Sequence, residues 1–343
     1  MTIGDSPKPI FLLVGLLLTC LVADLTVAQS INKNKKKEKK LPEIEPVTFV
    51  TKDYVEIHAD YFGGMHAKET VPVLLLHDFD SSRSAMLPLA RYLQKKFGHA
   101  VLVPDLRGHG KSMQVQGMEK AIDRSRFRKT ELASIFEDLE QCKRFLMAKN
   151  NVGELNIDLL SVVAVGSTCI QATHWVNSDW SWEPVGGLKQ GKDIKSLTMI
   201  SPVKKFKGIN ITGGLKNPIM TGKRGAALPV FMTWGSSNDV ASKDANSIHQ
   251  LMKKSRPNVS EKFGSDEWWK EASLVKVERK SSSAGMEFLK DQQSGINNDV
   301  GLFIEKKVLA NKDDYRWQNR SSDVPDDKDE DDDTEQGGSG NRG

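Results

Sequence analysis

The sequence predicts an α/β domain in which helices cover both faces of a mostly parallel sheet of seven or eight strands. Short continuous apolar runs, typical of strands buried on both faces, alternate along the chain with amphipathic stretches at helical spacing. This alternation favours parallel strands joined by helices. The chain has 343 residues, with 38% hydrophobic and 27% charged residues, which suits one such domain with polar ends.

The domain is expected to open with two β-rich segments, residues 47–52 and 54–62, which pair antiparallel around a short turn. The remaining strands are expected at residues 73–76, 100–104, 159–165, 196–201, 228–234 and 275–279, and the helices at residues 84–97, 130–147, 168–176, 245–254 and about 300–309. The connection between residues 201 and 228 is short, so no large lid domain is expected.

The N-terminus has the pattern of a secretory signal peptide, predicted over residues 1–28. Lys8 precedes an apolar run at residues 10–22, and residues 26–28 place small side chains before a cleavage point. The run is shorter than the roughly 20 residues of a spanning helix. We therefore expect export, to the medium, periplasm or envelope, and no transmembrane span in the mature chain. A membrane anchor and a lipoprotein signal at Cys20 are the alternatives.

Charged segments flank the predicted domain, which covers residues 46–310. Residues 33–40 hold six lysines and residues 323–335 hold nine acids. Neither composition can bury enough apolar surface to fold, which predicts a basic disordered linker at 29–45 and an acidic disordered tail at 311–343. The lysine run has no interleaved aromatic residues for base stacking, so no nucleic-acid partner is expected.

Three segments resemble the α/β-hydrolase superfamily. Residues 73–79 (VLLLHDF) resemble the strand and His-Gly turn that supplies part of the oxyanion hole. Residues 103–112 carry the string D-x-R-G-H-G-x-S, which is highly characteristic of the loop after the fourth strand, where His109 would be structural. Residues 162–171 place a strand and helix at the spacing of the nucleophile elbow. The resemblance implies an α/β-hydrolase fold, and a fold alone does not identify a function.

The elbow departs from the family pattern G-x-S-x-G. Counted from Gly166, the nucleophile position falls on Thr168 and the second glycine is replaced by Ile170. The extra methyl of threonine and the bulk of isoleucine predict a vestigial, non-catalytic elbow. A frame shifted by one residue would offer Ser167 or Cys169 as the nucleophile.

The resemblance also implies an oxyanion hole made by the backbone N–H groups of Phe79 and Cys169. Asp78 stands in place of the glycine of the His-Gly turn. A carboxylate at this point would oppose developing negative charge if it pointed inward.

The third departure concerns the catalytic acid and base. Asp239, just after the strand at 228–234, is the candidate acid. In chain order the family's histidine follows the next strand, within residues 281–298, and this window contains none; the last histidine is His249. Without a base, a hydroxyl is essentially not nucleophilic at neutral pH.

The sequence therefore indicates an exported α/β-hydrolase-fold protein that is catalytically silent and binds an unknown small molecule or protein. One alternative is an active esterase or peptidase-like hydrolase with an unorthodox nucleophile, and another is an envelope protein whose charged tails bind. No cofactor or metal is expected, because the histidines lack metal-ligand spacing and no phosphate-binding loop follows a strand. The pair Trp268–Trp269 could pack internally or form an exposed platform for a carbohydrate or peptide.

Overall fold

The computed structural model describes residues 40–185, 188–223, 225, 227–256, 259–260, 272–291 and 295–320. The chain divides into two compact units, residues 1–40 and 41–343, and the following concerns the second unit. The predicted signal peptide and the pair Trp268–Trp269 lie outside the described residues. In the described part of the chain, no helix has the length and apolar composition needed to cross a membrane.

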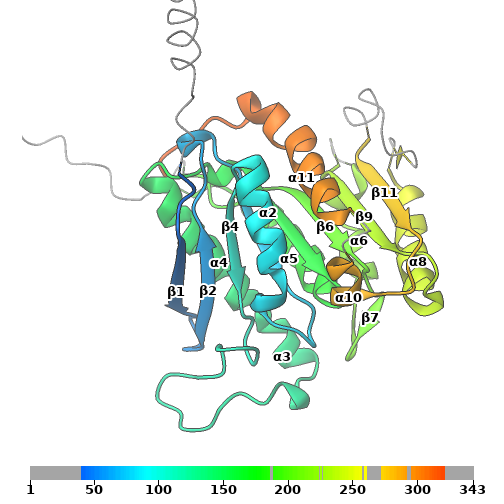
Figure 1. The fold of residues 1–343 in the computed structure, drawn as a ribbon, viewed down its shortest axis with the longest axis horizontal. Coiled ribbons are helices and arrows are strands. Elements are labelled where there is room, and N and C mark those ends of the chain that lie inside the picture. Colours follow the sequence, from blue (N-terminus) through cyan, green and yellow to red (C-terminus); the bar gives the residue numbers. More distant parts are fainter. Residues whose placement is uncertain are drawn as a thin grey trace, which may run out of the picture. The chain divides into compact units, whose positions relative to one another are not determined.

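A twisted sheet forms the centre of the molecule (Figure 1), and the described residues contribute nine strands to it. In order across the sheet these are β1 (Ile44–Val50), β2 (Glu56–Phe62), β4 (Ala100–Pro104), β3 (Pro72–Leu76), β5 (Leu160–Val165), β6 (Ile194–Ile200), β9 (Val230–Gly235), β11 (Leu274–Arg279) and the two-residue β10 (Val259–Ser260). β2 runs antiparallel to β1 and β4, and all other neighbours are parallel. The predicted mostly parallel sheet is confirmed, and β10 adds one short strand to the expected number.

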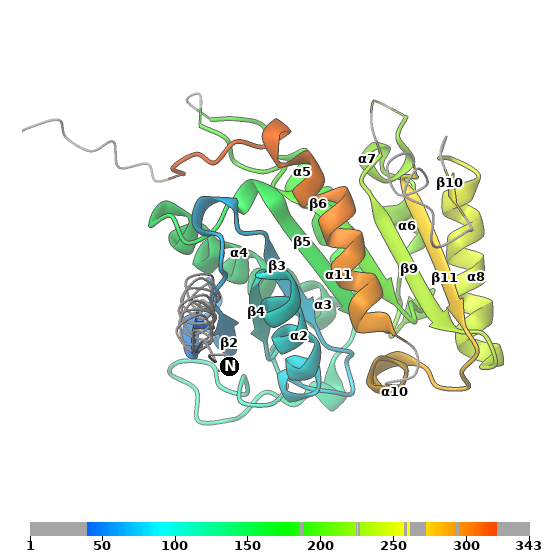
Figure 2. The same cartoon turned by 45° about the horizontal axis from the view of Figure 1, so that its top comes forward.

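Helices cover both faces of this sheet. One face carries α2 (Leu87–Phe97), α10 (Gly285–Lys290) and α11 (Ile296–Lys307), and the other carries α3 (Lys129–Ala133), α4 (Ile135–Asn151), α5 (Thr168–Ser181), α6 (Thr212–Leu215), α7 (Pro218–Thr221) and α8 (Asp239–Lys253). Figure 2 shows α2 and α11 side by side across their face. Strand side chains alternate between the two layers, so Leu74 and Leu76 join one apolar cluster and Val73 and Leu75 the other.

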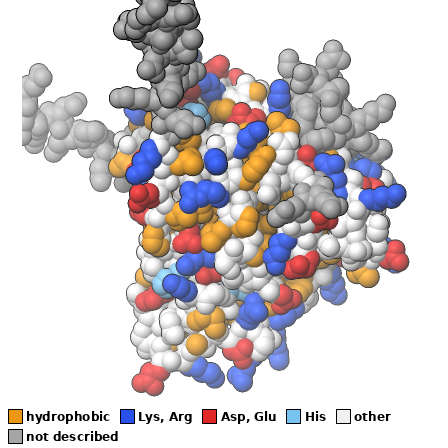
Figure 3. Space-filling model, in the orientation of Figure 1, with side chains coloured by type: hydrophobic (Ala, Val, Ile, Leu, Met, Phe, Trp, Pro, Cys, Tyr) orange, Lys and Arg blue, Asp and Glu red, His pale blue; other side chains and the backbone are white. Residues whose placement is uncertain are grey.

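The surface over α2 and α11 carries charges of both signs. Figure 3 shows lysine and arginine side chains interspersed with aspartate and glutamate across this face, with no large area of a single sign.

Two predicted helices differ from those in the structure. The helix expected at 130–147 is divided at Ser134 into α3 and α4. The helix expected at 245–254 begins six residues earlier, at Asp239, because the Asn238 side chain caps it by accepting a hydrogen bond from the Ala241 N–H (3.0 Å). In its described residues, the connection from β6 to β9 holds only the hairpin of β7 (Lys205–Phe206) and β8 (Ile209–Asn210) with two one-turn helices, α6 and α7.

The folded domain extends beyond the predicted boundaries of 46 and 310. At its start, Ile44 already pairs with Phe62 in the edge strand β1, which is too exposed to show a buried-strand pattern in the sequence. At its end, a 3-10 helix at Leu309–Asp314 continues into an extended segment that reaches Arg320. We call residues 309–320 the C-terminal strap. The remaining parts of the predicted linker and tail lie outside the described residues.

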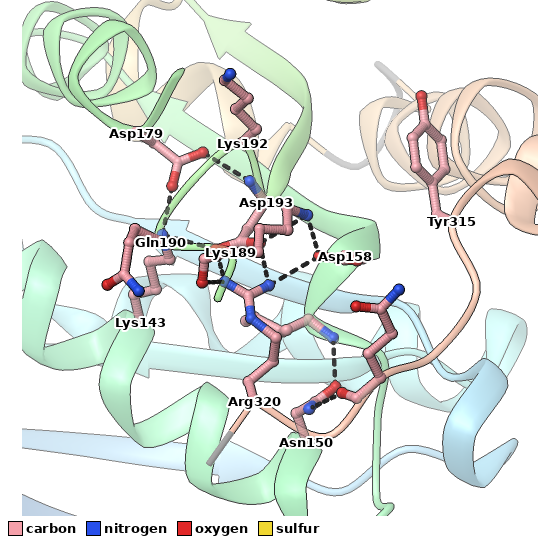
Figure 4. Close-up of polar contacts among 12 residues, drawn as sticks. Lys143, Asn150, Asp158, Asp179, Lys189, Gln190, Lys192, Asp193, Tyr315 and Arg320 are labelled. Atoms are coloured by element: carbon pink, nitrogen blue, oxygen red, sulfur yellow. Dashed lines mark hydrogen bonds and ion pairs between the residues drawn. The ribbon is translucent and has the colours of Figure 1, made fainter. Parts of the chain in front are cut away.

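Arg320 anchors the C-terminal strap in a buried network of charges (Figure 4). Its guanidinium group lies 2.7 Å from the Asp193 carboxylate and 3.0 Å from Asp158, and its side chain is 5% exposed. Lys143 and Lys189 each also pair with Asp193, at 2.8 and 3.1 Å. Burial raises the pKa of Asp193, but the surrounding cations outweigh this effect and hold the pKa below its ordinary value. A cation from the C-terminal strap thus completes a charge network at the amino-terminal ends of β5 and β6.

Candidate functional site

The carboxyl ends of β3, β5, β6, β9 and β11 meet at one edge of the sheet, where ligand sites form in open α/β folds. The loops that follow these strands surround a pocket of about 370 Å³. Its lining residues are Asp78, Asp80, Ser81, Gly166, Ser201, Val203, Ala241, Ala284, Gly285, Met286, Glu287 and Lys290. The pocket therefore contains residues from the predicted oxyanion turn, the elbow and the loop after the last long strand.

The sharp turn between β5 and α5 lies at Gly166, where φ is +60°. The nucleophile of a hydrolase elbow sits on such a strained strand-to-helix turn. Gly166 therefore occupies the nucleophile position, and it has no side chain. The predicted position, Thr168, is two residues too late: Thr168 is the first residue of α5, is buried, and donates its hydroxyl hydrogen bond to the Val165 carbonyl (2.8 Å).

The two alternative nucleophiles are also held in place. Cys169 is fully buried, with its thiol 3.3 Å from the Ala164 carbonyl, and burial raises the pKa of the thiol well above its ordinary value. Ser167 is 5% exposed and donates its hydroxyl hydrogen bond to Asp78 Oδ1 (2.8 Å). Neither group faces the pocket as a free nucleophile.

The Asp78 carboxylate occupies the oxyanion hole. Its Oδ1 accepts hydrogen bonds from the backbone N–H groups of Phe79 (2.8 Å) and Ser167 (2.9 Å). In this fold the hole is formed by the N–H that follows the nucleophile position and an N–H from the loop after β3. The predicted N–H of Phe79 takes part, but the predicted N–H of Cys169 does not, because it points to the Gly166 carbonyl (3.4 Å). The donors that would bind an oxyanion already hold the protein's own carboxylate.

Asp78 also fills the space of the missing nucleophile. A Cβ atom built on Gly166 would overlap the Asp78 carboxylate. Any side chain at residue 166 therefore requires Asp78 to move. The sequence contains a signal for this pairing. Asp78 replaces the glycine of the family's His-Gly turn, and Gly166 replaces the nucleophile. The prediction of Thr168 as the nucleophile position instead assigned Gly166 to the first glycine of the G-x-S-x-G pattern.

The loops for the catalytic acid and histidine lie side by side. Ser237 donates its backbone N–H to the Ser281 carbonyl, and the Asn238 side chain donates to the Ser282 carbonyl, both at 3.0 Å. Asp239 itself is exposed as the first residue of α8 and does not line the pocket. The chain thus brings the two loops together, but the second loop offers no imidazole for an acid to orient.

The two histidines beneath the site fix the loop after β3. His77 Nε2 accepts a hydrogen bond from the Leu106 N–H (3.2 Å), which leaves Nδ1–H to donate to the Asp78 carbonyl (2.8 Å). Burial lowers the pKa of His77 to about 4. His109 is buried between the carbonyls of Phe79 and Arg107, at 2.5 and 2.8 Å. Both rings hold backbone groups, and neither is placed to act as the missing base.

The D-x-R-G-H-G-x-S loop supports the site through ion pairs. Asp105 accepts hydrogen bonds from the N–H groups of Arg83 (2.8 Å) and Lys111 (3.0 Å). Arg107 contacts the buried Asp138 at 2.8 Å. Burial raises the pKa of Asp138 to about 6, against the lowering effect of the Arg107 guanidinium. These residues order the loop from inside and contribute no group to the pocket chemistry.

In the part of the chain that the structure describes, no group of three or more His, Cys, Asp or Glu side chains could hold a metal ion.

No model of a known protein family matches the sequence, and no curated protein matches it. Several solved structures are similar to the chain. An esterase from Pyrococcus furiosus, Pf2001, aligns with a TM-score of 0.54 at 16% identity, covering 78% of this chain and 93% of the esterase. A dienelactone hydrolase from Anabaena variabilis aligns with a TM-score of 0.50 at 13% identity, covering 79% of this chain and 98% of that one.

A third solved structure, the α/β hydrolase GrgF from a Penicillium species, aligns with a TM-score of 0.50 at 11% identity. The alignment covers 78% of this chain and 99% of GrgF. At these identities the likeness is one of fold. A shared fold does not identify a function, so the chemistry depends on this chain's own residues.

Proposed function

The chain has the α/β-hydrolase fold, and we propose that it is an exported, catalytically silent member of this fold that acts as a binding or interaction domain. The Asp78 carboxylate carries this proposal, because it lies in the oxyanion hole and in the space of the nucleophile side chain at once. An internal anion at this point opposes the negative charge that ester or amide hydrolysis develops.

Hydrolysis by this fold requires a nucleophile, a base and an oxyanion stabiliser. Gly166 offers no nucleophile, and the window for the histidine contains none. Loss of a single oxyanion donor lowers the rate about 10²- to 10³-fold, and loss of triad members lowers it by several further orders of magnitude. All three requirements fail together here, which supports a binding role.

The alternative is an active hydrolase that uses Ser167, Thr168 or Cys169. Each of these side chains would have to leave an internal partner, namely Asp78, the Val165 carbonyl or the Ala164 carbonyl. Among them, Ser167 is hydrogen-bonded to Asp78, which lines the pocket. We therefore use Ser167 and Cys169 to separate the two functions.

The purified full chain should hydrolyse short-chain nitrophenyl esters at the rate of buffer alone, and should not react with a fluorophosphonate probe. The Ser167→Ala and Cys169→Ala variants serve as controls and should behave identically to the parent. A rate well above buffer that collapses in either variant would refute the loss of catalysis and favour the hydrolase alternative.

Export is supported by Lys8, the apolar run at residues 10–22 and the small residues at 26–28. N-terminal sequencing of the mature protein should begin at or near Gln29. Recovery of an intact Met1 from the cytosol would contradict export and leave the binding role unaffected.

A further inference from the structure

We infer that the pocket beside Asp78 binds a primary ammonium group carried on a short aliphatic arm. The inference rests on the proposed loss of hydrolysis. The Asp78 carboxylate that blocks the oxyanion hole also makes the pocket attract a cation where an active hydrolase would stabilise an anion. A site that stabilises an anion repels cations, whereas a fixed carboxylate attracts them.

The first observation is the asymmetry of the Asp78 carboxylate. Every hydrogen bond that the described residues donate to this carboxylate goes to Oδ1. Its Oδ2 faces the space between Gly166 and Gly285, since a Cβ atom on Gly285 would lie 2.8 Å from it. Both glycines line the pocket. One carboxylate oxygen is thus anchored, and the other is presented to the pocket without a hydrogen-bond donor from the described residues.

Ser201 provides an independent observation in the same pocket. It is 1% exposed, and its hydroxyl has no hydrogen-bond partner among the described residues. Its φ of +47° is strained for a residue with a side chain, and such strain is characteristic of binding and catalytic sites. A buried hydroxyl without a partner is unfavourable, and a bound donor would satisfy it.

The other lining residues fit an ammonium on an aliphatic arm. Asp80 and Glu287 add two carboxylates, and Lys290, which is the one cation among the described lining residues, is paired with Glu287 at 2.8 Å. Val203 and Met286 provide apolar wall. An ammonium group has three donors, so one can serve Asp78 Oδ2 and the others remain for further acceptors among the lining residues, which include Ser201, while its carbon arm lies against the apolar side. An anionic ligand would instead face Asp78 and Asp80, and the Lys290 ammonium is shared with Glu287.

The ammonium could belong to a free amine or to a lysine side chain of a protein partner. Two probes distinguish these sources: n-butylammonium and Nα-acetyl-lysine methylamide, each titrated into the full chain at constant ionic strength by isothermal calorimetry or NMR. Butyrate and butanol are matched controls of the same length. Saturable millimolar binding is expected for at least one of the two amines, and none for butyrate or butanol. Binding of n-butylammonium alone assigns a free amine, and binding of the lysine derivative assigns a protein-borne lysine.

The Asp78→Asn variant keeps an acceptor for the two N–H groups but loses the charge, and should weaken amine binding at least tenfold. Ser201→Ala should weaken it several-fold. Asp313→Asn is the control, because Asp313 is an exposed carboxylate at the opposite edge of the sheet. This variant should leave amine binding unchanged. Equal binding of butyrate, no saturable binding of either amine, or undiminished binding by Asp78→Asn would overturn the inference. The ester assay on the same samples reports separately on the loss of hydrolysis, so either idea can fail alone.

Discussion

At the scale of single residues, Gly166 and Asp78 depend on each other. The glycine leaves room for the carboxylate, and the carboxylate satisfies two N–H groups that would otherwise point into the pocket. A side chain at residue 166 would be strained by the left-handed backbone conformation and would overlap the Asp78 carboxylate. We expect Gly166→Ala to lower the free energy of unfolding by at least about 2 kcal/mol.

A double-mutant cycle measured by urea unfolding tests this dependence. Gly166→Ala combined with Asp78→Gly should cost clearly less than the sum of the two single variants, because the second substitution removes the carboxylate that a Cβ at residue 166 overlaps. Gly117→Ala is the matched control, since Gly117 has a φ of +79° and no atoms near its missing Cβ. Additive costs, or equal costs for Gly117→Ala and Gly166→Ala, would show that Asp78 does not clash with residue 166.

The sequence located this site only in part. It identified Asp78 and Phe79 in the oxyanion turn, and the absence of a histidine from residues 281–298, because these follow from chain order. It could not fix the frame of the elbow. The string G-S-T-C-I allows several frames, and only the backbone angle of Gly166 selects one.

Among the structural elements, the C-terminal strap could not be predicted from amino-acid composition. It follows the last helix and precedes the acidic tail, so its few apolar residues gave no strand or helix pattern. Its attachment depends on individual contacts, such as the Trp317 indole donating to the Asn150 carbonyl (3.2 Å) and Arg320 pairing with Asp193. By contrast, the strands and long helices were predictable because their apolar residues repeat with fixed periods.

We expect Arg320→Ala to destabilise the domain by about 2–3 kcal/mol. The substitution removes charged hydrogen bonds to Asp158 and Asp193, while Lys189 still pairs with both carboxylates. Thermal and urea unfolding measure the effect. Lys312→Ala is the control, because the exposed pair of Lys312 with Glu69 should contribute little. A loss no greater than that of the control would show that Arg320 does not secure the strap.

At the scale of the whole molecule, buried histidines make stability depend on pH. Burial lowers the pKa of His77 to about 4 and that of His99 to about 3, from an ordinary value of 6.5. The unfolded chain therefore binds more protons below pH 6.5, and stability falls as the pH drops from 6.5 towards 4. Each histidine contributes a slope of up to about 1.4 kcal/mol per pH unit.

Urea unfolding at pH 7 and pH 5 measures this dependence. The parent should lose stability between the two values, and His99→Gln should lose less of it over the same interval. Asp193, whose pKa is lowered, adds a further loss only as the pH falls below its ordinary value of 3.8. Asp138 acts in the opposite direction, because burial raises its pKa to about 6 and its protonation adds stability as the pH falls through this value. A loss in His99→Gln that equals the loss in the parent would therefore contradict the burial of His99 as a neutral ring.

Because Gly166 and Asp78 depend on each other, neither residue can be replaced alone without a cost. A mutation that restores a serine at 166 meets the carboxylate, and one that removes the carboxylate at 78 gains no nucleophile and leaves two N–H groups unpaired. A serine nucleophile with a base therefore requires coordinated changes at three places, namely residue 78, residue 166 and the loop at 281–298, and no one of these substitutions assembles the site by itself.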